Sequence, residues 1–80
     1  MRLDKFLKIS RIIKRRTVAN DACDAAYVTA NGRPAKASYD VKEGDIIEIT
    51  FGQRTLKVRV VSVKEFTAKA DAASLYEVIL

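Results

Sequence analysis

Basic side chains are concentrated near the start of the chain, where their type and spacing suit the binding of phosphate groups. Four of them fall within residues 11–16. Residues 1–20 hold seven Lys or Arg residues against one acidic residue, Asp4, whereas residues 21–80 hold eight basic and nine acidic residues. A charge concentrated in this way creates a positive potential over one part of the surface, and it indicates a polyanionic partner such as a nucleic acid or an anionic surface.

Residue types that carry catalysis or bind metals are scarce. The chain has no His and a single cysteine, Cys23, so it lacks the commonest general base, any Ser-His or Cys-His nucleophile pair and the zinc sites built from Cys and His. Cys23 lies among alanines and is predicted to be a small buried apolar residue. Asp21 and Asp24 are interpreted as carboxylates that complement a helix dipole. We therefore predict no enzyme, no catalytic residue, no metal site and no cofactor.

The size and composition predict one globular domain over residues 1–80. Hydrophobic residues make up 49% and charged residues 31% of the chain, which is ordinary for a folded soluble protein. No apolar run approaches the roughly 18 residues that a membrane-spanning helix needs, and the first residues lack the apolar stretch of a secretory signal. We expect a cytoplasmic protein with no membrane partner.

Two short helices are predicted to position the basic residues. Leu3, Phe6 and Leu7 have the i, i+3, i+4 spacing of one helical face, and Arg2, Lys5 and Lys8 flank that face. A second helix is predicted from Thr17, which is interpreted as its N-cap. Its apolar side is expected to hold Val18, Ala19, Ala22, Ala25 and Ala26, with Asn20, Asp21 and Asp24 facing away.

The second helix is predicted to start directly after three basic residues, Lys14, Arg15 and Arg16. The start of a helix carries unpaired backbone N–H groups and the positive end of the dipole, so cations there are unfavourable in the isolated protein. The same arrangement becomes favourable when a phosphate binds. Such a local conflict is typical of a functional site.

A period of two residues predicts strands after residue 26. Val28 and Ala30 alternate with polar residues up to the turn at Asn31 and Gly32. Residues 46–51 and 55–63 alternate in the same way on either side of a Gly-Gln-Arg turn and predict an antiparallel hairpin. After a polar stretch at residues 64–71, residues 74–80 predict a last strand at the sheet edge. The predicted fold class is α+β, with two short helices packed on a small antiparallel or mixed sheet that ends in a C-terminal strand.

The aromatic residues and the cations of the hairpin have alternative interpretations. No paired aromatic residues mark adjacent strands as a base-stacking platform, so most aromatic residues are interpreted as core or turn residues, namely Phe6, Tyr39, Phe51, Phe66 and Tyr76. Tyr27 either stacks on a base or covers the core. Lys57 and Arg59 either extend a nucleic-acid surface or serve solubility and protection of the sheet edge.

Four motifs occur in order over residues 2–49, namely RLDKFLK, SRIIKRRTVAND, VTANG and VKEGDIIEI. Together they resemble the alpha-L RNA-binding domain first recognised in ribosomal protein S-four. Three further stretches, KRRT at residues 14–17, KASYDVKEGD at 36–45 and FGQ at 51–53, extend the resemblance over nearly the whole chain to one branch of that family. This branch is the RqcP (YabO) family of bacterial ribosome quality-control proteins.

The resemblance implies an RNA-binding protein that is not an enzyme. It implies binding to ribosomal RNA of the obstructed large subunit and to peptidyl-tRNA, beside an RqcH-type factor during C-terminal alanine tailing; we expect a monomer. The predicted RNA-binding residues are Arg2, Lys5, Lys8, Arg11, Lys14, Arg15, Arg16 and Thr17. Alternatives are a heat-shock-type protein that recycles large subunits, whose extra basic tail this sequence lacks, and a generic module that binds DNA, other nucleic acid or membranes.

The sequence departs from the family pattern at the end of the second helix. The family usually has Gly there, where this chain has Ala26, and a branched apolar residue where this chain has Ala30. Glycine adopts the left-handed conformation that ends many helices at little cost. Ala26 is therefore expected either to be strained or to leave the helix in a different way.

Overall fold

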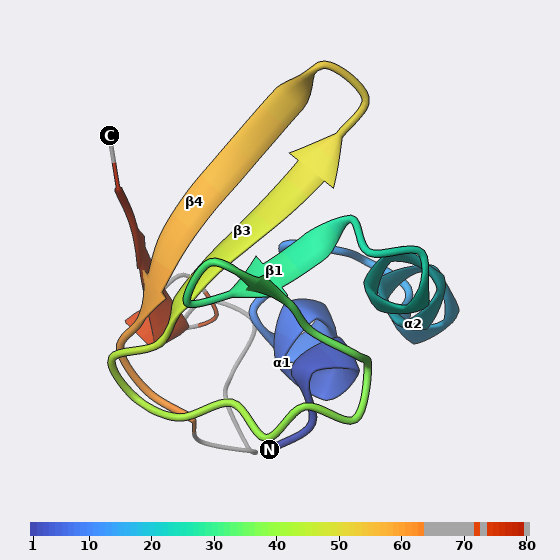
Figure 1. Ribbon diagram of the computed structural model, residues 1–80. Coiled ribbons are helices and arrows are strands. Elements are labelled where there is room, and N and C mark those ends of the chain that lie inside the picture. The colour runs from blue at the N-terminus through green and yellow to red at the C-terminus, as the bar shows by residue number, and fades with distance from the viewer. Residues whose placement is uncertain (64–71, 73, 80) are drawn as a thin grey trace.

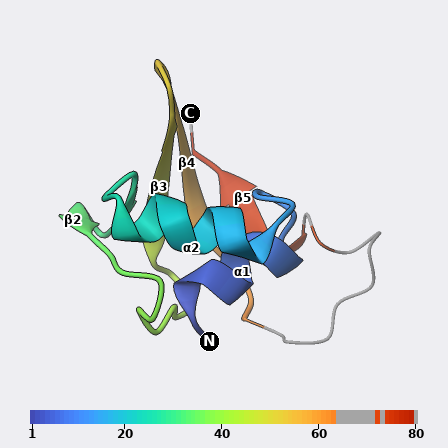
Figure 2. The same cartoon turned by 90° about the vertical axis from the view of Figure 1, so that its right-hand side faces the viewer.

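The architecture is that of two helices beside a five-stranded sheet. The computed structural model describes residues 1–63, 72 and 74–79. Helix α1 (Leu3–Ile9) packs against helix α2 (Arg16–Asp24), and the strands are β1 (Val28–Ala30), β2 (Arg33–Pro34), β3 (Ile46–Phe51), β4 (Arg54–Val60) and β5 (Tyr76–Val78). Their order in the sheet is β2-β1-β3-β4-β5, and every pairing is antiparallel (Figures 1 and 2). The predicted α+β class is confirmed.

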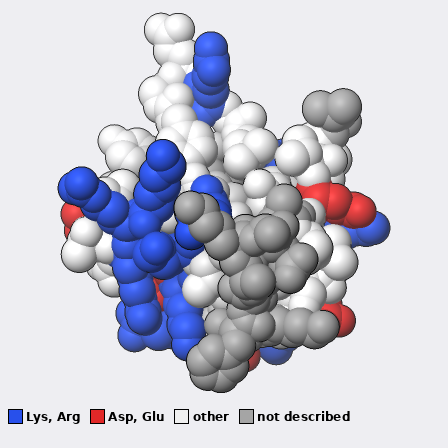
Figure 3. All heavy atoms as spheres, turned by 180° about the vertical axis from the view of Figure 1, so that it is seen from behind, with Lys and Arg blue, Asp and Glu red and all other residues white. Residues whose placement is uncertain are grey.

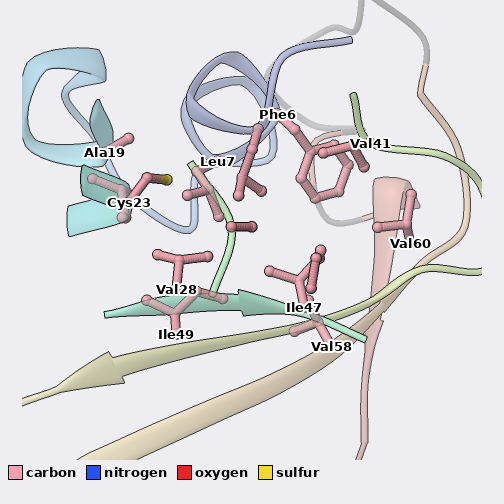
Figure 4. Packing of buried hydrophobic residues seen from close by; sticks show 14 of the residues in the cluster. Phe6, Leu7, Ala19, Cys23, Val28, Val41, Ile47, Ile49, Val58 and Val60 are labelled. Carbon is pink, nitrogen blue, oxygen red and sulfur yellow. The ribbon is translucent and has the colours of Figure 1, made fainter. Parts of the chain in front are cut away.

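The core lies between α1 and the sheet, and the predicted apolar face of α1 forms its centre. Leu3, Phe6 and Leu7 are fully buried. They face side chains of β1, β3 and β4 that include Val28, Ile47, Ile49, Val58 and Val60 (Figure 4). Burial of a side chain of this size contributes roughly 1.5–3 kcal/mol to the free energy of folding. The spacing of these three residues is therefore enough to determine which face of α1 packs on the sheet.

Cys23 is a buried residue of α2, as predicted. It is 3% exposed and belongs to the core cluster. Burial, together with the negative charges of Asp4 and Asp24, raises the pKa of the Cys23 thiol to about 11. The thiol therefore stays protonated at neutral pH and acts as a small apolar side chain.

Helix α2 begins earlier and is rotated differently than the sequence pattern predicts. Its N-cap is Arg15, in an extended conformation and with no side-chain cap, so the N-cap prediction for Thr17 is wrong. The side of α2 that enters the core holds Ala19 and Cys23, whereas Val18 is 49% exposed. Ala25 and Ala26 are also exposed, and Asn20, predicted to face away, is half-buried.

The loop of residues 35–45 passes along the start of α1 and holds it in place. The Leu3 N–H donates to the Tyr39 carbonyl oxygen at 2.9 Å, and Arg2 forms an isolated bridge with Asp40. The loop is closed by Asp45, which accepts hydrogen bonds from the Tyr39 hydroxyl at 2.8 Å and the Lys42 N–H at 3.0 Å. The position of Arg2 is therefore set by a segment far from it in the sequence.

The predicted β3–β4 hairpin is present, and the predicted turn after β1 leads into β2, a two-residue strand that the sequence pattern does not predict. In the β1–β2 turn, Asn31 and Gly32 have φ angles of 54° and 84°, which suit the tight turn that this dipeptide favours. Strands β3 and β4 form a longer hairpin that extends beyond the helices (Figures 1 and 2). Phe51 lies at its end, beside the turn, and is 45% exposed, so of the two interpretations, core or turn residue, the turn is the correct one.

The predicted last strand is confirmed as β5, which pairs with β4 at the sheet edge. Leu75, just before it, is 1% exposed and joins the core. The polar stretch at residues 64–71, with Phe66, lies outside the described residues. In the part of the chain that the structure describes, no helix is both long enough and apolar enough to cross a bilayer.

Ala26 ends the second helical segment in a strained conformation. Its φ angle is 65°, in the left-handed region that costs a residue with a Cβ roughly 1–2 kcal/mol. The Tyr27 N–H donates to the Ala22 carbonyl oxygen at 2.9 Å and closes the turn. Of the two expected outcomes, strain at Ala26 is therefore the correct one.

Substitution Ala26→Gly is expected to stabilise the protein by about 0.5–1 kcal/mol, because glycine removes the strain at a smaller entropic cost. Ala25→Gly is the matched control, since Ala25 has an ordinary φ angle of −86° and glycine there only adds entropy to the unfolded chain. Urea denaturation measures both variants. An Ala26→Gly protein no more stable than the wild type would contradict the strain.

Candidate nucleic-acid interface

The predicted basic residues come together on one part of the surface, which we call the cationic surface. Figure 3 shows Lys and Arg side chains gathered on the side of the molecule where the two helices lie. Lys5 is half-buried, and the other members are exposed. The cationic surface consists of Arg2, Lys5, Lys8, Arg11, Lys14, Arg15 and Arg16.

The loop between α1 and α2 is fixed by one buried anchor between its basic residues. Arg11 adopts a left-handed conformation with φ 62° and ends α1. The chain then turns back, so that Ile13 is 5% exposed and its N–H donates to the Leu7 carbonyl oxygen at 3.1 Å. Lys14 and Arg15 follow and are exposed. Burial of Ile13 therefore holds the neighbouring cations at the surface in a defined place.

A buried carboxylate lies beneath the cationic surface and joins its two ends. Asp4 on α1 is 2% exposed. Its Oδ1 accepts from Arg2 Nε at 3.1 Å and from the Lys5 backbone N–H at 2.8 Å. Its Oδ2 accepts from Arg16 Nε at 3.4 Å and Asn20 Nδ2 at 3.3 Å, both on α2. Asp4 thus sets the positions of both arginines and pairs α1 with α2.

These contacts change the acidity of Asp4. Burial alone would raise its pKa, but the hydrogen bonds from Arg2, Asn20, the Lys5 N–H and Arg16 together outweigh burial and lower the pKa below its usual value of 3.8. Asp4 therefore stays ionised at neutral pH. Its negative charge holds the guanidinium groups in place without covering them, since the side chains of Arg2 and Arg16 remain 51% and 49% exposed.

The start of α2 is a candidate anion site. Its first turn contains no acidic residue, and no side chain caps it. A shallow cleft of about 340 Å³ opens beside it, lined by Asp4, Arg16, Thr17, Asn20 and Asp21. Backbone N–H groups, the positive end of the dipole and exposed guanidinium groups favour a phosphate at the start of α2, whereas the carboxylates of Asp4 and Asp21 oppose an anion deeper in the cleft. Thr17 lies at the site, although as a residue of the first turn and not as the N-cap.

The residues with alternative interpretations differ in their surroundings. Lys57 pairs with Glu48, with 3.7 Å between Nζ and Oε1, and Arg59 pairs with Glu77 on β5. These ion pairs favour the interpretation that Lys57 and Arg59 serve the sheet. Tyr27 is 56% exposed and does not cover the core.

Asp4 and Asn20 are the residues of the site that sequence reasoning missed. The sequence pattern predicts Asn20 on the outer face of α2, and it marks Asp4 only as the lone acidic residue among seven cations. That isolation was the available signal. An acidic residue alone in a basic segment, one position from the buried Leu3, is well placed to organise the cations around it.

Sequence comparison with known proteins identifies the family of this chain. The S4 domain model matches residues 1–47. The chain is 54% identical over 78 residues to the RQC P-site tRNA stabilizing factor of Halalkalibacterium halodurans, covering 98% of this chain and 89% of that protein. The chain belongs to the S4 domain family, among the RQC P-site tRNA stabilizing factors. The Bacillus subtilis protein of the same name is 49% identical over 79 residues, which cover 99% of this chain and 92% of that protein.

Solved structures show the same S4-type fold. Heat shock protein 15 of Vibrio cholerae, described as trimeric, superposes with a TM-score of 0.90 at 28% identity and covers 99% of this chain and 81% of that one. The solution structure of the hypothetical protein HP1423 superposes with a TM-score of 0.83 at 30% identity, covering 100% and 98%. The resemblance to the S-four RNA-binding domain that the motifs indicated is thereby confirmed.

Substitution Asp4→Asn is expected to lower the free energy of unfolding at pH 7 by about 1–3 kcal/mol, because it weakens buried hydrogen bonds to charged groups. Since the folded pKa of Asp4 is lowered, the wild-type advantage is complete above the unfolded pKa of 3.8 and is lost as the pH falls through the folded pKa. The difference between the two proteins should therefore shrink below pH 3.8.

Urea denaturation at several pH values between 7 and 3 measures this effect. The control is Asp24→Asn, which removes an exposed carboxylate from the same pair of helices and is expected to change stability by less than about 0.5 kcal/mol. An Asp4→Asn effect of equal size at every pH would show that the charge of Asp4 does not stabilise the fold.

Proposed function

We propose that this chain is a ribosome quality-control factor that binds ribosomal RNA of the obstructed large subunit together with peptidyl-tRNA. The observation that carries the proposal is the cationic surface, whose arginines are held by buried Asp4 next to an α2 start without acidic residues. The name shared by the relatives, RQC P-site tRNA stabilizing factor, supports it. The proposed RNA-binding residues are Arg2, Lys5, Lys8, Arg11, Lys14, Arg15, Arg16 and Thr17.

The mechanism is binding by preorganised guanidinium groups. Asp4 accepts hydrogen bonds from the Nε atoms of Arg2 and Arg16 and from Nη2 of Arg2, and about half of each arginine side chain remains exposed. A planar guanidinium binds a phosphate through two parallel hydrogen bonds. Because these arginines are ordered before RNA arrives, less conformational entropy is lost on binding. Base edges in the A-form major groove are inaccessible, so the contacts read RNA shape.

The finer roles follow from the family. We propose that the chain holds the tRNA between elongation steps while an RqcH-type factor adds alanine residues, that it acts by binding alone and not as an enzyme, and that it works in the cytoplasm. We also propose that it acts as a monomer, in contrast to the trimeric structure described for the Vibrio heat shock protein.

A role like that of heat shock protein 15 is the second candidate, because the fold is shared and the Aeromonas salmonicida homologue is 36% identical over 75 residues. The quality-control relatives named above are 54% and 49% identical to the chain, against 36% for this one. The quality-control role is therefore favoured. Recovery of large subunits that carry peptidyl-tRNA with the tagged chain tests it, and recovery of free RNA alone would reduce the function to generic RNA binding.

Substitution Arg16→Ala is expected to weaken binding to structured RNA. The plot of log affinity against log salt should become less steep by roughly 0.7–0.9, which corresponds to the loss of about one phosphate contact. The matched control is Arg59→Ala. Both arginines pair with a carboxylate and have similar exposures, 49% and 53%, but Arg59 lies outside the cationic surface.

Fluorescence anisotropy titrations at several salt concentrations measure the slope, and circular dichroism shows whether each variant is folded. If Arg16→Ala and Arg59→Ala had equal effects, binding would depend only on total charge. An unchanged affinity in folded Arg16→Ala would remove Arg16 from the proposed site.

A further inference from the structure

The end of the β3–β4 hairpin carries an aromatic ring and a cation that folding does not explain. Phe51 and Arg54 are directly paired across the two strands, so their side chains leave the same face of the hairpin. The hairpin extends past both helices (Figures 1 and 2). We call residues 51–54 the hairpin end.

The core stops before it reaches Phe51. The preceding pair on the same face is Ile49 with Leu56, of which Ile49 is fully buried and Leu56 half-buried. Phe51 is 45% exposed and is absent from the core cluster and from the residues packed against it. The ring therefore adds little to stability, although a polar residue at a hairpin end would be better solvated.

The charge around the hairpin end suits a polyanion. Residues 49–63 contain three cations and no Asp or Glu. Two of these cations have carboxylate partners, since Lys57 pairs with Glu48 and Arg59 with Glu77. Within residues 1–63, 72 and 74–79, no ion pair is recorded for Arg54.

We propose that the hairpin end is a second RNA-binding site that takes an unpaired nucleotide. The Phe51 ring stacks on the base, and the Arg54 guanidinium binds the adjacent phosphate. An exposed aromatic ring beside a cation is the combination that binds single-stranded RNA, because every base offers a flat face and every nucleotide a phosphate. A protein partner would need a suitable apolar group and an acidic group side by side, whereas every nucleotide carries a base and a phosphate. RNA is therefore the favoured occupant. The inference rests on the proposed function and extends it to an unpaired segment.

The test uses the full chain and two RNAs with equal numbers of phosphates, a stem-loop with an unpaired loop and a blunt duplex. Phe51→Leu keeps an apolar side chain but removes the ring, and it is expected to lower affinity for the stem-loop roughly 5- to 50-fold while affinity for the duplex is unchanged. Phe51→Tyr retains the ring and should retain the affinity. Circular dichroism confirms that each variant is folded.

Arg54→Gln tests the phosphate contact, and Lys57→Gln is its control, because it removes the same charge from the same strand. Arg54→Gln is expected to weaken stem-loop binding more than Lys57→Gln. Wild-type affinity of Phe51→Leu for the stem-loop would overturn the second site and leave the proposed function intact, with a protein as the occupant to examine next. If wild-type protein bound neither RNA, the proposed function itself would fail.

Discussion

The buried carboxylate of Asp4 is the interaction on which the rest of the site depends. A charge that is 2% exposed is tolerated in a folded protein only when it is paired and hydrogen-bonded. Asp4 meets this requirement with donors from both helices, of which Arg16 and Asn20 lie 12 and 16 residues away in the sequence. The same contacts relieve repulsion among the cations before RNA binds. One negative charge therefore pairs the helices and keeps the cationic surface assembled.

Two kinds of local conflict occur in this small fold, and they have different meanings. Basic residues at the uncapped start of α2 are unfavourable for the isolated chain. Two features hold them there nonetheless, namely the buried Ile13 in the preceding loop and the hydrogen bond from Arg16 to Asp4. Ala26, in the left-handed conformation, follows the C-terminal end of α2 and is not among the residues that line the cleft at the start of that helix. The first conflict agrees with the proposed binding of a phosphate at the start of α2. The second is backbone strain at a residue that does not line the cleft, and glycine would relieve it.

Periodicity was sufficient to predict α1, β1 and the β3–β4 hairpin, because each of these buries one regular face, whereas β5 was indicated by its β-forming residues although it buries little. Periodicity failed at α2, because the small apolar residues there and just after it give no unique apolar side, and the hydrogen bonds of Arg16 and Asn20 to Asp4 on α1 could not be predicted from periodicity. It did not decide between core and turn at Phe51, because alternation shows which face a residue takes but not how far the helices cover that face. The cationic residues were predictable from charge alone, whereas the residue that positions them was not.

The two proposed contacts differ in how they are attached to the fold. The cationic surface lies on the helices, which are packed on the core, while the hairpin end projects from the sheet (Figure 1). Because both belong to one small body with a radius of gyration of 11.1 Å, an RNA that reaches one contact can engage the other only if its own geometry matches their separation. Linked contacts of this kind strengthen binding strongly when the spacing fits and not at all when it does not. A rigid pair of weak contacts could therefore distinguish an assembled ribosomal site from free RNA without reading sequence.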